Sequence, residues 1–169
     1  MAGDIFISTI LEFIAGVCLD SNCSKPITYK TYIVTEVCEI KLPSCIESVE
    51  DAAKKAAEFA RERALSDEFS FAIDLAIRES VANAVKHGNK FDESKNVEVK
   101  MEDSDDGFGI TVRDFGEGFA VDEIPDPTHP ENLLKTNGRG ILFMRSFMDD
   151  IEWSNHPEGG LVVKMFKKR

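Results

Sequence analysis

The sequence has few of the residues that form disulfides or bind metal ions. It contains four cysteines and three histidines among 169 residues. The cysteines form no Cys-x-x-Cys pair and no histidine lies near them in the sequence, which argues against a structural zinc site. We expect free thiols, as in intracellular proteins, at Cys18, Cys23, Cys38 and Cys45.

A long uninterrupted apolar run is also absent. The most apolar stretch, residues 1–19, contains Asp4 and Glu12 and has no basic start, so it matches neither a signal peptide nor a membrane span. Its large apolar residues recur at helical spacing, which favours an amphipathic helix that docks on the domain or on a second copy. These residues are Phe6, Ile10, Phe13 and Val17.

Basic residues are in the minority. The 20 Lys and Arg residues against 31 Asp and Glu residues give a formal charge of −11, which argues against nucleic-acid binding and favours a basic protein partner. The length suits one domain. We expect an N-terminal extension over residues 1–31 and a core domain over residues 32–169, in a cytoplasmic protein with no membrane contact.

Hydrophobic periodicity of about 3.6 residues predicts three helices, at about residues 46–64, 66–88 and 140–148. Ser44 and Glu47 have the spacing of a capping box before the first helix, and Ser66 can cap the second. Gly88 is expected to end the second helix in a left-handed conformation.

Apolar and polar residues alternate, or β-branched residues concentrate, in five segments that we expect to be strands. They are residues 32–42, 97–101, 110–115, 151–154 and 161–167. Between the third and fourth of these, residues 121–137 contain Pro125, Pro127 and Pro130, which exclude one regular helix and predict a lid-like loop.

The first of three polar motifs lies near the end of the second predicted helix. Glu79, Asn83 and His87 are four residues apart, which places them on one helical face. Asn83 offers a neutral oxygen suited to magnesium, and Glu79 can take a proton from an attacking hydroxyl. An exposed polar stripe is the simpler alternative. His87, near a helix end, can also serve only to cap carbonyl groups.

The second and third motifs are glycine-rich. Asp114 is followed by Gly116, Gly118 and Phe119, so a carboxylate that can accept from the amino group of adenine stands beside backbone that a flat ring can approach. Taken alone, this pattern is also common in turns. The third motif precedes a predicted helix, whose exposed amides can hold phosphate oxygens; it comprises Gly138, Arg139 and Gly140.

The order of the three motifs, with a lid between the second and third, resembles the GHKL (Bergerat-type) ATP-binding domain. Within that superfamily, residues 83–88 and 138–149 most resemble the bacterial anti-sigma factor serine-protein kinases. The resemblance implies an α/β (α+β) two-layer sandwich, in which helices cover one face of a mixed, mostly antiparallel sheet. It also implies a homodimer.

The same resemblance implies the roles of the motif residues. Glu79 would be the general base, Asn83 the magnesium ligand, Asp114 the adenine reader and the turn from Gly138 to Gly140 a phosphate contact. Arg139 is a further candidate, as a charge stabiliser, at a position that the family does not fix. His87, Gly116, Gly118 and Phe119 would complete the nucleotide site. The cofactors would be ATP and Mg²⁺.

The family reaction transfers the γ-phosphate of ATP to a serine of an anti-anti-sigma (STAS) protein, and the same domain alternately sequesters a sigma factor. The alternative is a non-catalytic ATP-binding module that holds a regulatory protein. The sequence does not identify the sigma factor, the acceptor serine or the upstream signal.

Overall fold

The computed structural model describes residues 34–118 and 139–169, and the fold is stated for these residues. They form five strands, three α-helices and one π-helical turn. In chain order these are β1 (Val34–Pro43), α1 (Glu47–Glu62), α2 (Asp67–Asn83), the π turn η1 (Ala84–Gly88), β2 (Asn96–Ser104), β3 (Gly107–Arg113), α4 (Arg139–Phe147), β4 (Asp150–Asn155) and β5 (Leu161–Lys168).

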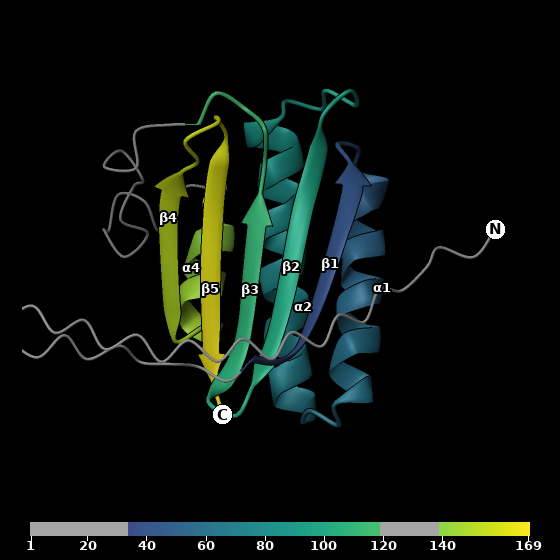
Figure 1. Ribbon diagram of the computed structural model, residues 1–169, viewed down its shortest axis with the longest axis vertical. Helices are drawn as coiled ribbons and strands as arrows, with labels where there is room; N and C mark the ends of the chain where they lie inside the picture. Colours follow the sequence, from purple (N-terminus) through teal and green to yellow (C-terminus); the bar gives the residue numbers. More distant parts are fainter. Residues whose placement is uncertain (1–33, 119–138) are drawn as a thin grey trace, which may run out of the picture.

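The strands form one sheet in the order β1-β2-β3-β5-β4, and the helices lie together on one face of it (Figure 1). This confirms the predicted two-layer α+β sandwich. The expected mixture of parallel and antiparallel pairs is not seen, because every described pairing is antiparallel.

The connections explain the purely antiparallel pairing. Two helices, α1 and α2, separate β1 from β2. Together they bring the chain back to the end of the sheet at which β1 finishes, so β2 runs in the opposite direction to β1. One helix, α4, lies between β3 and β4, and these strands run in the same direction (Figure 1). The hairpin strand β5 is inserted between them, however, so they never pair.

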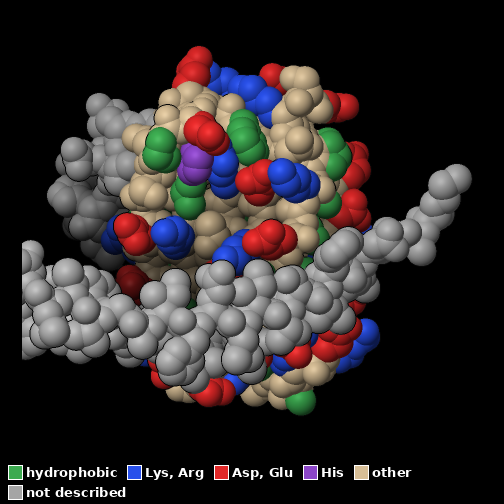
Figure 2. Space-filling view, viewed as in Figure 1, with side chains coloured by type: hydrophobic (Ala, Val, Ile, Leu, Met, Phe, Trp, Pro, Cys, Tyr) green, Lys and Arg blue, Asp and Glu red, His purple; other side chains and the backbone are tan. Residues whose placement is uncertain are grey.

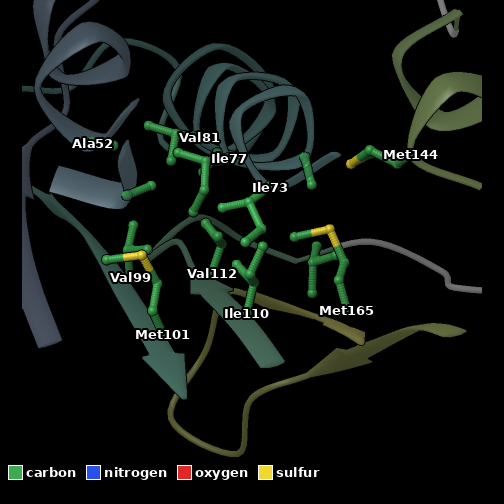
Figure 3. Close-up of a cluster of buried hydrophobic side chains, with 14 of the residues drawn as sticks. Ala52, Ile73, Ile77, Val81, Val99, Met101, Ile110, Val112, Met144 and Met165 are labelled. Carbon is green, nitrogen blue, oxygen red and sulfur yellow. The ribbon is translucent and has the colours of Figure 1, made fainter. Parts of the chain in front are cut away.

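The core lies between the helix layer and the sheet (Figure 3). Ile73, Ile77 and Val81 of α2 are buried against Val99 of β2 and Ile110 of β3. The spacing of the α2 residues puts them on one stripe of the helix, and the strand residues come from alternating positions. Hydrophobic periodicity therefore predicted the core face of both layers.

The opposite face of the sheet is polar. The residues of β2 and β3 that alternate with the buried ones include charged side chains such as Lys100 and Arg113. Lys41 pairs with Glu98 at 2.7 Å, and Lys100 with Glu102 at 2.8 Å. Figure 2 shows acidic and basic side chains interspersed over the described part of this face. Antiparallel sheets tolerate such one-sided solvation.

The two predicted helix caps differ in outcome. Ser66 caps α2 as expected, because its side chain accepts from the Phe69 N–H at 3.3 Å. The predicted capping box at Ser44 is wrong. The N-cap of α1 is Ile46, and the buried Ser44 hydroxyl has no hydrogen-bond partner among the residues that the structure describes. The Ser44 N–H instead donates to the Lys95 carbonyl at 3.1 Å.

Two other expectations concern thiols and membranes. Cys38 and Cys45 are free, and burial raises the pKa of the Cys38 thiol. Among the described residues, no helix combines the length and apolar character needed to cross a bilayer. The predicted amphipathic segment at residues 1–19, together with Cys18 and Cys23, lies outside the described residues, and so does the predicted lid at residues 121–137.

Candidate nucleotide site

The first motif straddles the junction between α2 and the π turn. Glu79 and Asn83 are half-buried on α2, while His87 lies in η1 and is exposed. The turn is closed by the Asn89 N–H, which donates to the Ala84 carbonyl at 2.7 Å, five residues back. Such π turns occur often at functional sites and are rarely evident from sequence. His87 makes no hydrogen bond to another described residue, so the predicted alternative of a carbonyl cap is not seen there.

Gly88 is required for a reason other than the one predicted. Its φ is not left-handed. Two residues that follow it, Lys90 and Phe91, are left-handed, at φ 55° and 59°. A Cβ on Gly88 would overlap the Asp114 carboxyl group and lie 2.7 Å from the Asp114 Cβ. A Cβ on Gly116 would likewise lie 2.7 Å from the Gly88 carbonyl carbon. Gly88, at the end of the first motif, therefore packs closely against Asp114 and Gly116 of the second.

Asp114 is a buried carboxylate held by backbone amides. It follows the last residue of β3 and is 4% exposed. Its Oδ1 accepts from the Gly116 N–H at 2.9 Å and from the Leu161 N–H at 3.1 Å. Among the described residues nothing donates to Oδ2, so one oxygen is held and the other is free to accept from a ligand.

Gly140 brings the third motif to the first. It is the second residue of α4, and a Cβ there would overlap a carboxylate oxygen of Glu79 and lie 2.9 Å from the Glu79 carboxyl carbon. The α2 and α4 helices pack together, so the Glu79 carboxylate lies at the N-terminus of α4, where backbone amides are unpaired. This is the end of a helix that suits phosphate.

The two contacts, at Glu79 and at Gly88, lie at different positions along α2 and the π turn that continues it. Residues 79 and 88 are nine positions apart, which at the α-helical rise of about 1.5 Å per residue corresponds to at most about 14 Å, since the last five residues form the π turn. Asp114 lies at one end and Gly140 at the other, with Asn83 between them on the helix. The arrangement suits an extended ligand with a ring at one end and phosphates at the other.

The remaining predicted site residues are placed only in part. Gly118 has φ +70° and lies beside Asn155, so a Cβ there would be 3.3 Å from the Asn155 side-chain carbonyl carbon. Phe119 and Gly138 lie outside the described residues, and Arg139 is described only as the first residue of α4.

Asn89 was not among the predicted site residues. It is 1% exposed, its Oδ1 accepts from the Phe115 N–H at 2.8 Å, and its Nδ2 donates to the Asn96 carbonyl at 2.8 Å. Leu161 was also missed, although its N–H holds Asp114. The only sequence signal for Asn89 is its place directly after Gly88; Leu161 gave none, since it is 47 residues from Asp114.

A separate cavity of about 520 Å³ lies at the opposite end of the sheet, near the C-terminus, and is lined in part by Arg63, Lys167 and Arg169. Arg63 and Arg169 both pair with the buried Asp103. Two cations of this cavity are thus engaged in ion pairs, and none of the described residues predicted for the site lines it.

The fold and the order of the motifs match an ATPase-domain class of protein. A model of the histidine kinase-like ATPase domain matches residues 42–167, well over half of the chain. The chain belongs to this family, in its branch of anti-sigma factors and serine-protein kinases.

Two relatives illustrate that branch. The chain is 36% identical to an anti-sigma F factor of Clostridium perfringens over 100 residues, covering 57% of this chain and 70% of the relative. It is 28% identical to the serine-protein kinase RsbW of Oceanobacillus iheyensis over 135 residues, covering 76% of this chain and 84% of the relative.

A solved structure supports the fold. The crystal structure of the RsbU and RsbW domains of a Mycobacterium tuberculosis protein matches with a TM-score of 0.58 and 19% identity over 78% of this chain. The match spans only 32% of that protein. At this identity the likeness concerns the fold alone.

Proposed function

We propose that this chain is an anti-sigma factor and serine-protein kinase. It would bind ATP with magnesium, phosphorylate a serine of an anti-anti-sigma (STAS) protein, and alternately hold a sigma factor. The observation that supports this most is the meeting of all three motifs along α2 and η1, with Asp114 against Gly88 and Glu79 against Gly140. The names of the relatives support the partner-switching part of the proposal.

The reaction needs one bond formed, one broken and one proton moved. The acceptor serine oxygen attacks the γ-phosphorus while the bond from that phosphorus to the β-γ bridging oxygen breaks, releasing ADP. The hydroxyl proton passes to the Glu79 carboxylate. Such transfers depend chiefly on positioning and charge stabilisation. The amides at the N-terminus of α4 would hold the phosphate oxygens beside Glu79.

The donor set around Asn83 fits magnesium only together with a nucleotide. Among the described residues, no group of three His, Cys, Asp or Glu side chains converges to hold a metal. The Asn83 amide oxygen is a single ligand of the type that magnesium accepts, and phosphate oxygens and water would complete its six positions. Bound there, magnesium would neutralise charge on the phosphates.

Other features of the proposal rest on the resemblance to the family. We place the functional domain at residues 32–169, with residues 1–31 as an extension, in a homodimeric cytoplasmic protein. Phe119, Gly138 and Arg139 would complete the nucleotide contacts.

The decisive experiment separates catalysis from binding. Purified wild-type protein with ATP and magnesium should phosphorylate a STAS protein encoded by the same organism. Glu79→Gln keeps the size of the side chain but removes the base, so it should lower the phosphorylation rate by about 100-fold or more while leaving the Kd for ATP within about twofold. Glu68→Gln, in the first turn of the same helix, is the matched control and should behave as wild type.

The same experiment tests the non-catalytic alternative. If the wild type binds ATP tightly yet phosphorylates no STAS protein, the chain is a nucleotide-dependent binding module and the kinase assignment falls. A Glu79→Gln variant that phosphorylates at the wild-type rate would remove Glu79 from the role of base.

A further inference from the structure

Asn89 links three parts of the molecule that are separate in sequence. Its backbone N–H closes the π turn on Ala84, its Nδ2 donates to the carbonyl of Asn96 at the start of β2, and its Oδ1 accepts from the N–H of Phe115, just after β3. Its own carbonyl accepts from the Asp92 N–H at 3.1 Å. Each of its polar atoms is therefore engaged although the residue is 1% exposed.

The orientation of this side-chain amide is determined by its neighbours. One neighbour, the Phe115 N–H, can only donate, and the other, the Asn96 carbonyl, can only accept. Only one of the two flips of the amide satisfies both. A buried amide with both partners satisfied holds its surroundings in one arrangement, and removal of one partner leaves the other unpaired.

The Phe115 N–H belongs to the peptide group that joins Phe115 to Asp114. By accepting from it, Asn89 fixes the plane of that peptide and hence the direction in which the Asp114 side chain leaves the backbone. The amides of Gly116 and Leu161 then hold Oδ1 of the carboxylate. Oδ2 stays available, and Gly88, directly before Asn89, packs against the same carboxyl group.

We infer that Asn89 is a positioning residue for Asp114 and thereby sets the preference of the site for adenine over guanine, without touching the nucleotide. This inference rests on the proposed function, in which Asp114 accepts from the adenine amino group. Guanine carries a carbonyl at that ring position, which a carboxylate repels. The preference therefore depends on where Oδ2 points.

The test is the ratio of the dissociation constants for ATP and GTP, measured by titration calorimetry well below the melting temperature of each variant. Asn89→Ala removes both side-chain hydrogen bonds. Asn89→Asp, like Asn89→Ala, loses the hydrogen bond to the Asn96 carbonyl, but it keeps a side-chain oxygen that can accept from the Phe115 N–H. We expect Asn89→Ala to weaken ATP binding about tenfold, equivalent to about 1.4 kcal/mol, with little change for GTP. Asn89→Asp should keep a ratio close to that of the wild type.

Two controls separate positioning from general destabilisation. Ser104→Ala removes a buried hydrogen bond of 2.9 Å to the Gly107 carbonyl at the far end of β2, and should lower stability without changing the ratio. Asp114→Asn should remove the preference for ATP in an otherwise wild-type protein.

The outcomes distinguish this inference from the proposed function. If wild type prefers ATP and Asn89→Ala keeps the wild-type ratio, the inference about Asn89 is wrong while the nucleotide site stands. The inference is also wrong if Asn89→Asp folds but does not prefer ATP over GTP. Failure of both Asn89 variants to fold overturns it too, because Asn89 would then be needed for stability alone. If the wild type binds neither nucleotide, the proposed function falls and the inference falls with it.

Discussion

At the scale of single residues, Gly140 of α4 lies directly against the carboxyl group of Glu79, the proposed general base. The atom that its Cβ would overlap is the far end of the Glu79 side chain, which is half-buried and can move. Gly140→Ala should therefore displace the carboxylate and leave the fold intact. Because alanine is the better helix former, stability should be unchanged or higher by up to about 1 kcal/mol.

We expect Gly140→Ala to reduce phosphorylation by about 100-fold, the range attributed to a well-placed general base. Thermal melting and a phosphorylation assay on the same preparation measure both effects. Gly109→Ala on β3 is the control, since a Cβ there would meet its neighbours at ordinary distances of 3.7–4.0 Å. A large loss of stability in Gly140→Ala would show that the α2–α4 contact is rigid and that Glu79 cannot give way.

Single residues also show which features of the site could be predicted from the sequence. Glu79 and Asp114 were proposed as site residues because their residue types and spacing match a chemical task. Gly88 was identified for the wrong reason: a left-handed helix end was expected, and the close approach of Asp114 is what excludes a side chain. That approach depends on a residue 26 positions away, which no local pattern contains. Asn89 was missed for the same reason.

At the scale of elements, α1 and α2 are joined by Arg78. Its guanidinium donates to Glu50 of α1 at 2.6 Å and to both carboxylate oxygens of Asp74, one turn earlier on α2, at 2.9 and 3.0 Å. The hydrogen bond from Arg78, followed by its positive charge, lowers the pKa of Glu50. The α1–α2 packing should therefore respond to acid.

The sign follows from linkage. A carboxyl group whose pKa is lower in the folded state stabilises the fold above its unfolded pKa, about 4.3 for Glu, and loses that contribution as the pH falls through the folded value. Arg78→Gln should lower the Tm at pH 7 by about 1 to 3 °C, because exposed ion pairs contribute little. The difference from wild type should shrink as the pH falls below about 4.3.

Melting curves from pH 7 to pH 3 measure this difference. Arg61→Gln, at the end of α1, is the control. Arg61 makes no ion pair among the described residues and acts on Glu58 only through its charge, so its effect should vary less with pH than that of Arg78→Gln. A Tm difference between wild type and Arg78→Gln that is constant with pH would contradict the role of Glu50.

The π turn is a second feature that belongs to the scale of elements. A continuous helix to residue 88 was predicted, and the observed α2 ends at Asn83 with η1 following. Periodicity cannot distinguish the two, because a single wider turn hardly changes the spacing of apolar residues. The choice depends on hydrogen bonds to Asn96 and Phe115, which exist only once β2 and β3 are in place.

At the scale of the whole molecule, binding energy should appear as stability. A ligand at 100 times its Kd adds about 2.7 kcal/mol to the folded state, which for a chain of 169 residues corresponds to about 5 to 10 °C in Tm. We expect this rise for wild type with ATP and magnesium, and its loss in Asn83→Ala. Asn96→Ala is the control: the Asn96 side chain is exposed, so this variant should keep the rise in Tm. Asn155→Ala is unsuitable as a control because Asn155 lies beside Gly118.

Scanning fluorimetry with ATP alone and with ATP plus magnesium measures this rise in Tm. Absence of any rise in wild type would exclude a nucleotide site. A full rise in Asn83→Ala would place the magnesium ligand elsewhere.

The sequence by itself determined the local features of this protein. Helical and alternating periodicity identified the helices and strands, and residue chemistry identified three motifs and their order. Only the tertiary structure decided that β5 inserts between β3 and β4, that Leu161 holds Asp114, and that Asn89 joins the first motif to the second. The physical reason is range: periodicity reports which face of an element is buried, whereas these contacts depend on chain segments that meet only when the whole sheet has formed.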